Sequence, residues 1–310
     1  MIDSLESRFT SGQERALARG ISLLEAGDAA GQRLLKAVRA LGGHAHIVGI
    51  TGGPGSGKST LTDGLIAVAR AQGKRVAVLA VDPTSPYSGG AILGDRIRMM
   101  RHHADADVFI RSLATRGQLG GLAAATLQAA ALLDAYGFDL VFIETVGVGQ
   151  SEVDIVRVAD TTLLVLTPGQ GDGVQAFKAG IMEIADVFVV NKADQPGSGR
   201  LKREIKAALE LAPQPEGWRP PVQETVASEG QGVPELLDTL AAHRAYLEKL
   251  GELSRLRGER ARFEVSALLA ERVRGRLEAL ESRLVDAVLS GDASAAEVVD
   301  TLLGERPVGA

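Results

Sequence analysis

A glycine-rich run at residues 52–59, GGPGSGKS, constrains the fold of this chain more than any other feature. It follows a short apolar run that ends at Thr51, and it precedes a stretch with helical periodicity that starts near Lys58. The pattern GxxxxGK[ST] between a strand and a helix is typical of a phosphate-binding loop. Its glycines let backbone N–H groups converge on phosphate oxygens, and the helix N-terminus adds a favourable dipole. The loop is therefore expected at the end of a strand in an α/β sheet.

Short apolar runs alternate with longer helical stretches from His46 onward. Several runs are apolar at consecutive positions, as in strands that are buried on both faces. This alternation predicts the fold class α/β, a doubly wound and mostly parallel sheet with ligands at the carboxyl ends of its strands. The expected strands are His46–Thr51, Arg75–Val81, Val108–Arg111, Leu140–Thr145, Thr162–Thr167, Val187–Asn191 and Val222–Val226.

Both ends of the chain are expected to be helical extensions, which divides it into residues 1–44, 45–245 and 246–310. Two apolar helix faces are expected in the first part, separated by Gly27; their residues are Leu17, Ile21 and Leu24, then Leu34, Leu35, Val38 and Leu41. A long C-terminal helix carries one apolar stripe, at Leu269, Val273, Leu277, Leu280, Leu284 and Val288. Ser294 and Glu297 predict a capping box for a last helix.

Composition limits the class of protein. The 310 residues include no cysteine, which excludes disulfides, thiolate metal sites and a cysteine nucleophile. The net charge is −5, so no general basic field for nucleic acid is expected. The first residues lack a signal-peptide pattern, and no uncharged apolar run reaches the ~18 residues of a membrane span. We expect a soluble, cytoplasmic protein whose partners include neither nucleic acid nor a membrane.

The glycine-rich loop supplies the expected contacts to nucleotide phosphates. Lys58 is expected to reach the β- and γ-phosphates, and the Ser59 hydroxyl is expected to bind Mg²⁺. The residues assigned to nucleotide binding here are Gly53, Pro54, Gly55, Ser56, Gly57, Lys58, Ser59 and Thr60.

The run NKAD at residues 191–194 predicts guanine rather than adenine as the base. The Asp194 carboxylate can only accept hydrogen bonds, and guanine offers two donors there, whereas adenine presents an acceptor. Asn191 is expected to hold the loop and contact the base, and the stem of Lys192 is expected to cover the ring. Ser228 and Glu229, after the last expected strand, would form a second base-contacting loop.

A third group of residues is expected to sense the γ-phosphate. The run ETVG puts Glu144 within reach of Mg²⁺, through water, and the Gly147 N–H within reach of the γ-phosphate. Gln150 is a candidate for positioning the attacking water. Asp82 and Asp95 lie on either side of a different segment, residues 85–94, which is also rich in glycine. Both are further candidates for binding the metal, and Asp95 is also a candidate for contacting the attacking water.

With these residues assembled, the chain resembles the MeaB/ArgK family of P-loop GTPases, which belongs to the SIMIBI class and includes the human methylmalonic aciduria type A protein. The matching stretches are GITGGPGSGKST (49–60), AVLAVDPTSPYSGGAILGDRIRM (77–99), GQLGG (117–121), FIETVGVGQSE (142–152), PGQGDGVQAFKAGI (168–181) and VNKAD (190–194). They cover most of residues 46–195, and the flanking helices match in layout more than in residues.

The resemblance implies a GTP-binding and GTP-hydrolysing chaperone that uses Mg²⁺ and serves an adenosylcobalamin-dependent methylmalonyl-CoA mutase. Such a protein gates cofactor loading and protects the mutase. By the same resemblance, residues 83–95, 146–157 and 168–180 are switches, and Lys178 acts in hydrolysis or in signalling to the mutase. Residues 1–44 would pack on a GTPase domain, 45–245, and residues 246–310 would form a homodimer. The catalytic candidates are Lys58, Asp95, Glu144, Gln150 and Lys178, and the metal candidates are Ser59, Asp82, Asp95 and Glu144.

Several residues depart from the family pattern. Gly53 and Ser56 stand where larger apolar residues are expected, and the run at 85–87 is less rich in Ser and Thr. The C-terminal arm lacks the expected tryptophan-containing segment, with residues 263–265 in its place. These departures concern the partner and the dimer geometry more than the nucleotide chemistry.

Other interpretations remain open. A kinase or transport ATPase is disfavoured by Asp194, because ATP would bind poorly. A GTPase metallochaperone would need metal-binding clusters, and the chain offers only the adjacent pair His102 and His103. A regulatory SIMIBI GTPase with a different partner, or a structural dimer with a relic phosphate loop, would keep the fold. No arginine finger is evident within the chain, so intrinsic hydrolysis is expected to be slow.

Overall fold

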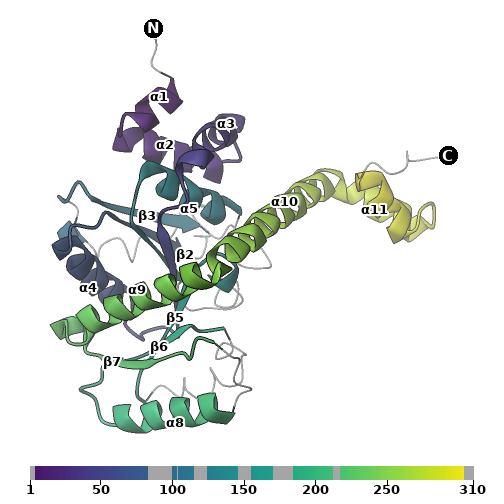
Figure 1. The fold of residues 1–310 in the computed structure, drawn as a ribbon. Coiled ribbons are helices and arrows are strands. Elements are labelled where there is room, and N and C mark those ends of the chain that lie inside the picture. The colour runs from purple at the N-terminus through teal and green to yellow at the C-terminus, as the bar shows by residue number, and fades with distance from the viewer. Residues whose placement is uncertain are drawn as a thin grey trace. The chain divides into compact units, whose positions relative to one another are not determined.

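The computed structural model describes residues 4–82, 100–102, 104–114, 124–145, 155–169, 184–211 and 217–303. These residues contain a seven-stranded sheet of order β3-β2-β4-β1-β5-β6-β7, in which every neighbouring pair is parallel (Figure 1). The strands are β1 (His46–Thr51), β2 (Val76–Asp82), β3 (Val108–Ala114), β4 (Leu140–Thr145), β5 (Thr161–Leu166), β6 (Val187–Asn191) and β7 (Val222–Thr225). The predicted α/β class and all seven strands are confirmed.

The four middle strands form the centre of the core. Every residue of β1, β4, β5 and β6 is buried, which explains why apolar residues follow one another in their central positions. The register pairs Ile50 of β1 with Glu144 of β4. This pairing places the one acidic residue of β4 beside the strand that leads into the glycine-rich loop.

Helices cover both faces of the sheet. On one face, α4 (Lys58–Ala71) and α9 (Val233–Leu250) share an apolar cluster with residues of β1, β2 and β5 that includes Leu163 and Val165. The alternate residues Leu164 and Leu166 pack instead with α8 (Ser198–Leu211). Because successive residues of a strand point to opposite faces, α8 covers the other face. The sheet is thus doubly wound.

The N-terminal helices pack on α5 (Ala124–Tyr136), which contacts β2 and β4. They are α1 (Leu5–Thr10), α2 (Glu14–Glu25) and α3 (Ala29–Val38). The predicted core residues of α2 and α3 are buried, but the expectation for Leu41 is wrong, because its side chain is 52% exposed. The chain tightens into the 3₁₀ turn η1 (Arg39–Leu41) after α3, so the periodicity of 3.6 residues does not continue to Leu41.

The chain divides into two compact units, Met1–Arg260 and Ala261–Ala310. The first contains the sheet and the short turns η2 (Met100–His102), η3 (Ile155–Arg157) and η5 (Ala227–Glu229). The helix α10 (Glu252–Ser290) begins in the first unit, and α11 (Ala295–Leu303) follows it. The predicted capping box of α11 is confirmed, because Ser294 Oγ accepts from Glu297 N (3.2 Å) and Glu297 Oε2 accepts from Ser294 N (2.8 Å). No helix in the described part of the chain is both long and apolar enough to cross a membrane.

Candidate nucleotide-binding site

The glycine-rich loop connects the end of β1 to the first residue of α4, as the sequence predicted. Two of its glycines lie where no side chain fits. A Cβ atom on Gly52, whose φ is +142°, would lie 2.1 Å from the backbone oxygen of Val165. A Cβ atom on Gly57, whose φ is +87°, would lie 2.4 Å from Asn191 Nδ2. The loop therefore owes its path to close backbone approaches that only glycine permits.

Lys58 lies inside this loop. Its side chain is buried, and its Nζ donates to the backbone oxygens of Gly52 (2.7 Å) and Gly53 (3.0 Å). It is also the first residue of α4, and the backbone N–H groups at a helix N-terminus carry partial positive charge. The ammonium group and the helix terminus thus bring positive charge to one place, which suits the phosphates of a nucleotide.

Beside the loop lies a buried carboxylate held by two hydroxyl groups. Glu144 at the end of β4 is 2% exposed, and Ser59 Oγ donates to its Oε1 at 2.6 Å. Thr62 Oγ1 lies 3.1 Å from Oε2 of Glu144 and 3.0 Å from the backbone oxygen of Lys58. Carboxylate and hydroxyl oxygens are hard ligands of the kind that Mg²⁺ prefers. The side chains of Ser59 and Glu144 therefore fit a magnesium ion.

Sequence reasoning missed Thr62. The available signal was its position three residues after Ser59, which puts both side chains on the same face of α4. That face meets Glu144 only because β1 pairs with β4, and no local pattern reveals this pairing.

Asn191, the last residue of β6, connects three segments. It is 2% exposed, and its Nδ2 donates to the backbone oxygen of Ser56 in the glycine-rich loop (2.9 Å). Its Oδ1 accepts from Thr225 Oγ1 (3.1 Å) and from the backbone N–H of Ala227 (3.2 Å). These three hydrogen bonds join the phosphate loop to β7 and η5.

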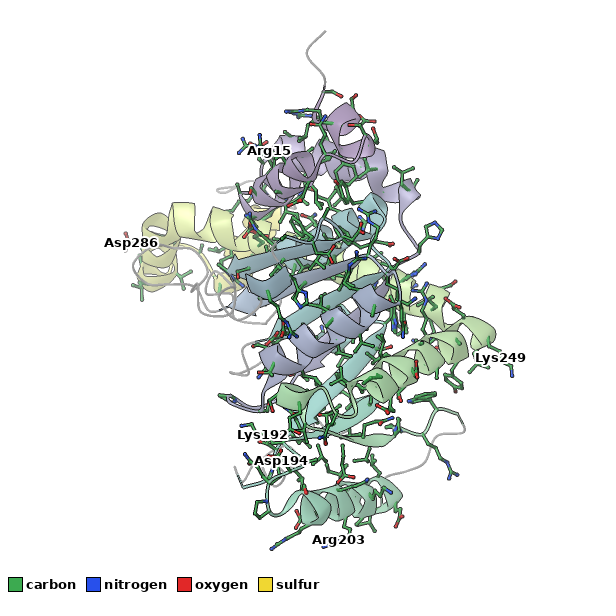
Figure 2. The ribbon with its side chains drawn as sticks, turned by 90° about the vertical axis from the view of Figure 1, so that its left-hand side faces the viewer. Arg15, Lys192, Asp194, Arg203, Lys249 and Asp286 are labelled. Carbon is green, nitrogen blue, oxygen red and sulfur yellow. The ribbon has the colours of Figure 1, made fainter. Side chains whose placement is uncertain are left out.

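Lys192 and Asp194 follow Asn191 and lie near one another (Figure 2). Lys192 is the one described residue other than glycine with a positive φ, 56°. Such a backbone conformation is uncommon and is found often at functional sites. Its Nζ donates to the backbone oxygen of Gly55 at 2.9 Å, so its stem lies along the loop. The Asp194 side chain is exposed.

The second expected base-contacting loop forms the turn η5. Ala227, its first residue, donates its backbone N–H to Asn191, so the turn lies beside residues 191–194. Ser228 and Glu229 are exposed, and Glu229 Oε2 accepts from Gln231 Nε2 at 2.7 Å. The structure therefore brings both predicted base loops to the same edge of the sheet as the phosphate loop.

Several predicted site residues lie outside the described residues: Asp95, Gly147, Gln150 and Lys178. Asp82 ends β2 and pairs with Ala114 of β3, one position beyond the pair of Val81 and Thr145. Its backbone is therefore at the same sheet edge as Glu144.

The adjacent residues His102 and His103 were considered as metal ligands of a metallochaperone. His102 Nε2 lies 2.9 Å from Asp63 Oδ1, and Arg101 pairs with the same carboxylate. His103 lies outside the described residues. Within the described ranges, no three His, Cys, Asp or Glu side chains are grouped so that they could hold a metal ion. His102 is accounted for by its contact with Asp63.

Known proteins resemble this chain over the whole sheet domain. The family model described as methylmalonyl Co-A mutase-associated GTPase MeaB matches residues 17–282. A protein of Pyrococcus abyssi that carries a provisional GTPase name is 52% identical over 282 residues, which are 90% of this chain and 87% of that protein. The methylmalonic aciduria type A homolog of Mus musculus, named as mitochondrial, is 34% identical and covers 97% of this chain and 79% of its own. The crystal structure of a LAO/AO transport system kinase has a TM-score of 0.72 at 26% identity, covering 97% of this chain and 95% of that one.

Proposed function

This chain belongs to the MeaB family of methylmalonyl-CoA mutase-associated GTPases, and on that basis we propose that it is a chaperone of an adenosylcobalamin-dependent methylmalonyl-CoA mutase. In this proposal, GTP binding and hydrolysis gate the loading of the cofactor and protect the mutase. The observation that carries the proposal is the family match over residues 17–282, which contain the whole candidate site. GTPase activity follows from family membership, and the partner and its protection are the proposed part.

The phosphates of GTP are proposed to lie in the loop formed by residues 53–60. Backbone N–H groups of the loop and of the first turn of α4 would donate to phosphate oxygens. Lys58 would exchange its contacts with the Gly52 and Gly53 oxygens for the β- and γ-phosphates, a short movement for a buried side chain already inside the loop. These interactions favour the negative charge that develops on the phosphates during hydrolysis.

Mg²⁺ is proposed to lie at Ser59 and near Glu144, with Asp82 and Asp95 as further candidate ligands. Their support is the 2.6 Å contact between Ser59 Oγ and Glu144 Oε1, together with the position of Asp82 at the same sheet edge. When bound, the ion would neutralise charge between the β- and γ-phosphates. Glu144 is held from its other oxygen by Thr62, so its carboxylate is positioned before a metal arrives.

Guanine is proposed to bind at Asp194, with Ser228 and Glu229 on the second side of the base. The Asp194 carboxylate would accept from the N1–H and the 2-amino group of guanine, and Lys192 would cover the ring. Asn191 has the proposed role of holding these loops against the phosphate loop, supported by its three hydrogen bonds. Recognition of the base and of the phosphates would then depend on the same side chain.

Coupling to the mutase is proposed to run through residues 83–95, 146–157 and 168–180. In these segments Gly147 would bind the γ-phosphate, Gln150 would position the attacking water, and Lys178 would act in hydrolysis or in signalling to the mutase. Two of these segments start at the ends of β2 and β4, and the third follows β5, all at the nucleotide edge of the sheet. Each of the three segments follows a different strand at the nucleotide site. A change of nucleotide at the site could therefore change the segments that a partner contacts.

The division into an N-terminal extension (1–44), a GTPase domain (45–245) and a C-terminal homodimerisation arm (246–310) remains part of the proposal. The proposed role of residues 246–310 in dimerisation is supported by exposed apolar side chains on α10, where Val265 is 67% exposed and Leu269 is 56% exposed. Sedimentation of the wild-type chain and of Leu269→Glu tests this. A dimer that the variant weakens is expected, and a wild-type monomer at micromolar concentration would contradict the arm's role.

The partner is tested by binding. The full chain is mixed with a purified adenosylcobalamin-dependent methylmalonyl-CoA mutase, and complex formation is measured by calorimetry with GDP and with a non-hydrolysable GTP analogue. We expect a complex whose affinity differs between the two nucleotides, and a Lys58→Ala variant in which this difference disappears. Absence of a complex in every nucleotide state would refute the mutase as the partner and would leave the GTPase assignment untouched.

A further inference from the structure

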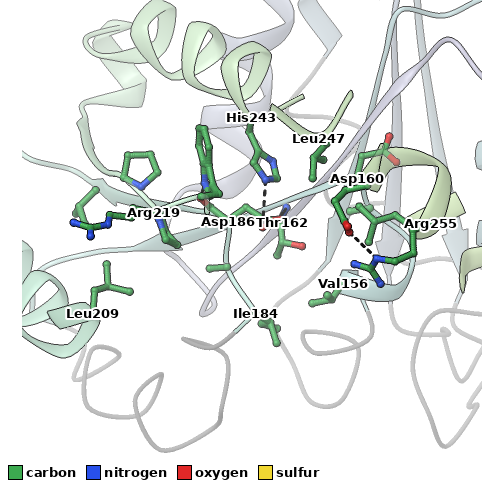
Figure 3. A pocket seen from close by; sticks show the side chains of 18 of the residues that line it. Val156, Asp160, Thr162, Ile184, Asp186, Leu209, Arg219, His243, Leu247 and Arg255 are labelled. Atoms are coloured by element: carbon green, nitrogen blue, oxygen red, sulfur yellow. Dashed lines mark hydrogen bonds and ion pairs between the residues drawn. The ribbon is translucent and has the colours of Figure 1, made fainter. Parts of the chain in front are cut away.

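Figure 3 shows a cavity of about 1250 Å³. It lies where strands of the sheet start, whereas the glycine-rich loop follows the end of β1. Its lining includes Thr162 at the start of β5, Asp186 directly before β6, and Val222 at the start of β7. The helices α8 and α9 and the first turn of α10 complete it. Parallel strands of five or six residues separate the two edges by roughly 20 Å, so a ligand here would not compete with a nucleotide.

Asp186 lies on the floor of the cavity, and its carboxylate has no cationic partner among the residues that the structure describes. Asp186 Oδ2 accepts from the backbone N–H of Thr162 at 2.7 Å, and Oδ1 lies 3.6 Å from His243 Nε2. Among the described residues, no lysine or arginine pairs with Asp186, whose side chain is 35% exposed. Burial raises the pKa of Asp186 to about 6 and lowers the pKa of His243 to about 4. At neutral pH the carboxylate is therefore charged and its neighbour is neutral.

Aromatic rings stand next to this carboxylate. Trp218 Nε1 donates to the backbone oxygen of Asp186 at 2.8 Å, which fixes the indole beside it. The ring centroids of Trp218 and His243 are 4.7 Å apart, and His243 is fixed from behind by Thr161 Oγ1 at 2.8 Å. The faces of aromatic rings attract cations, most strongly in tryptophan. A fixed indole beside an unbalanced carboxylate is the combination that binds an organic ammonium group.

The remaining lining is apolar on the walls and nearly balanced in charge at the rim. Ile184, Leu209 and Leu247 contribute to the walls. At the rim, Arg255 pairs with Glu252 (2.6 Å), and the exposed residues Lys206, Arg219 and Glu210 are also part of the lining. The second aspartate of the lining, Asp160, pairs with Arg260 (2.6 Å). The rim carries both positive and negative side chains, so it does not favour an anion. The carboxylate of Asp186 on the floor therefore makes the cavity favour a cationic ligand.

We propose that this cavity binds an organic cation, an ammonium group on an apolar or aromatic body, with the ammonium at Asp186 and the body against Trp218. The volume exceeds what one small ligand needs, so a body larger than a single ring also fits.

The chain provides its own probe, because Trp218 is its only tryptophan. Fluorescence of the full-length protein is titrated with benzyltrimethylammonium, with neutral benzyl alcohol and with anionic phenylacetate, each also against free N-acetyltryptophanamide to correct for collisional quenching. We expect saturable binding of the cation only, unchanged by saturating GDP. Equal or tighter binding of phenylacetate, or no saturable binding of the cation, would overturn the proposal.

Variants of the lining residues test whether the cation binds at Asp186. Asp186→Asn keeps an oxygen that can accept from the Thr162 N–H and removes the charge, so cation affinity should fall at least about tenfold. Glu210→Gln, which removes a carboxylate from the rim of the same cavity, should change affinity less than about threefold. Calorimetry on Trp218→Leu, with folding checked by its melting curve, should also show weakened binding. Unchanged affinity in Asp186→Asn, or equal losses in both carboxylate variants, would refute Asp186 as the anchor.

Discussion

Replacing Asn191 by alanine tests whether one buried amide holds the nucleotide site together. The substitution removes three hydrogen bonds, to Ser56, Thr225 and Ala227, and leaves their backbone and hydroxyl groups buried without that partner. Each such bond contributes about 0.5–1.5 kcal/mol net, so the free energy of unfolding should fall by about 2–4 kcal/mol. The loops must then be ordered by the ligand itself, and GTP affinity should fall by about 10- to 100-fold.

The measurement combines chemical denaturation with calorimetric titration of GDP and a GTP analogue. Thr225→Val keeps the volume and removes one of the three bonds, so it should lose roughly a third as much stability. Gln195→Ala, an exposed position in the same loop, should change stability by less than about 0.5 kcal/mol. If Asn191→Ala is folded and binds GTP within twofold of wild type, the loops do not depend on this residue.

Three further predictions concern the metal, the base and pH. Thr62→Val removes the hydroxyl group that lies 3.1 Å from Glu144 Oε2. The Mg²⁺ affinity of the GDP-bound protein should therefore fall about fivefold, while the GDP affinity measured in EDTA stays unchanged. Equal losses of affinity in both titrations would contradict a role for Thr62 in positioning Glu144. Asp194→Asn should lower the affinity for GTP at least about 100-fold and raise the affinity for xanthosine triphosphate. If nucleotide titrations show that the variant still prefers GTP, the Asp194 carboxylate does not recognise the base. Burial lowers the pKa of His46 to about 3 from its ordinary 6.5, so the unfolded chain binds the proton first and stability falls as pH drops below 6.5. By pH 5 this should amount to about 2 kcal/mol, visible in denaturation curves as a smaller loss in His46→Gln than in wild type.

The sheet was predictable because its signals are local. The runs 46–51, 140–145 and 187–191 are mostly apolar, and each forms a buried strand with the expected bounds. The glycine-rich loop was equally clear, because its pattern has fixed spacing between a strand and a helix. Leu41, predicted on the same apolar helix face as Val38, is exposed because the chain leaves the α-helical period there for a 3₁₀ turn.

The contacts that join distant segments were not predictable. Thr62 meets Glu144 across 82 residues of sequence, and Asp160 pairs with Arg260 across 100 residues. Both contacts depend on the order of strands in the sheet, which alternation of apolar runs does not specify. The cavity at Asp186 and Trp218 depends on three strand starts and three helices, so no single stretch of sequence carries its signal.

The most direct test of the account is GTP hydrolysis by the purified full-length chain, measured with and without an adenosylcobalamin-dependent methylmalonyl-CoA mutase and with Lys58→Ala as the blank. We expect slow hydrolysis by the chain alone, loss of hydrolysis in Lys58→Ala, and a clear rise in rate when the mutase is added. A rate that the mutase leaves unchanged would contradict the proposed coupling, and hydrolysis retained in Lys58→Ala would contradict the site itself.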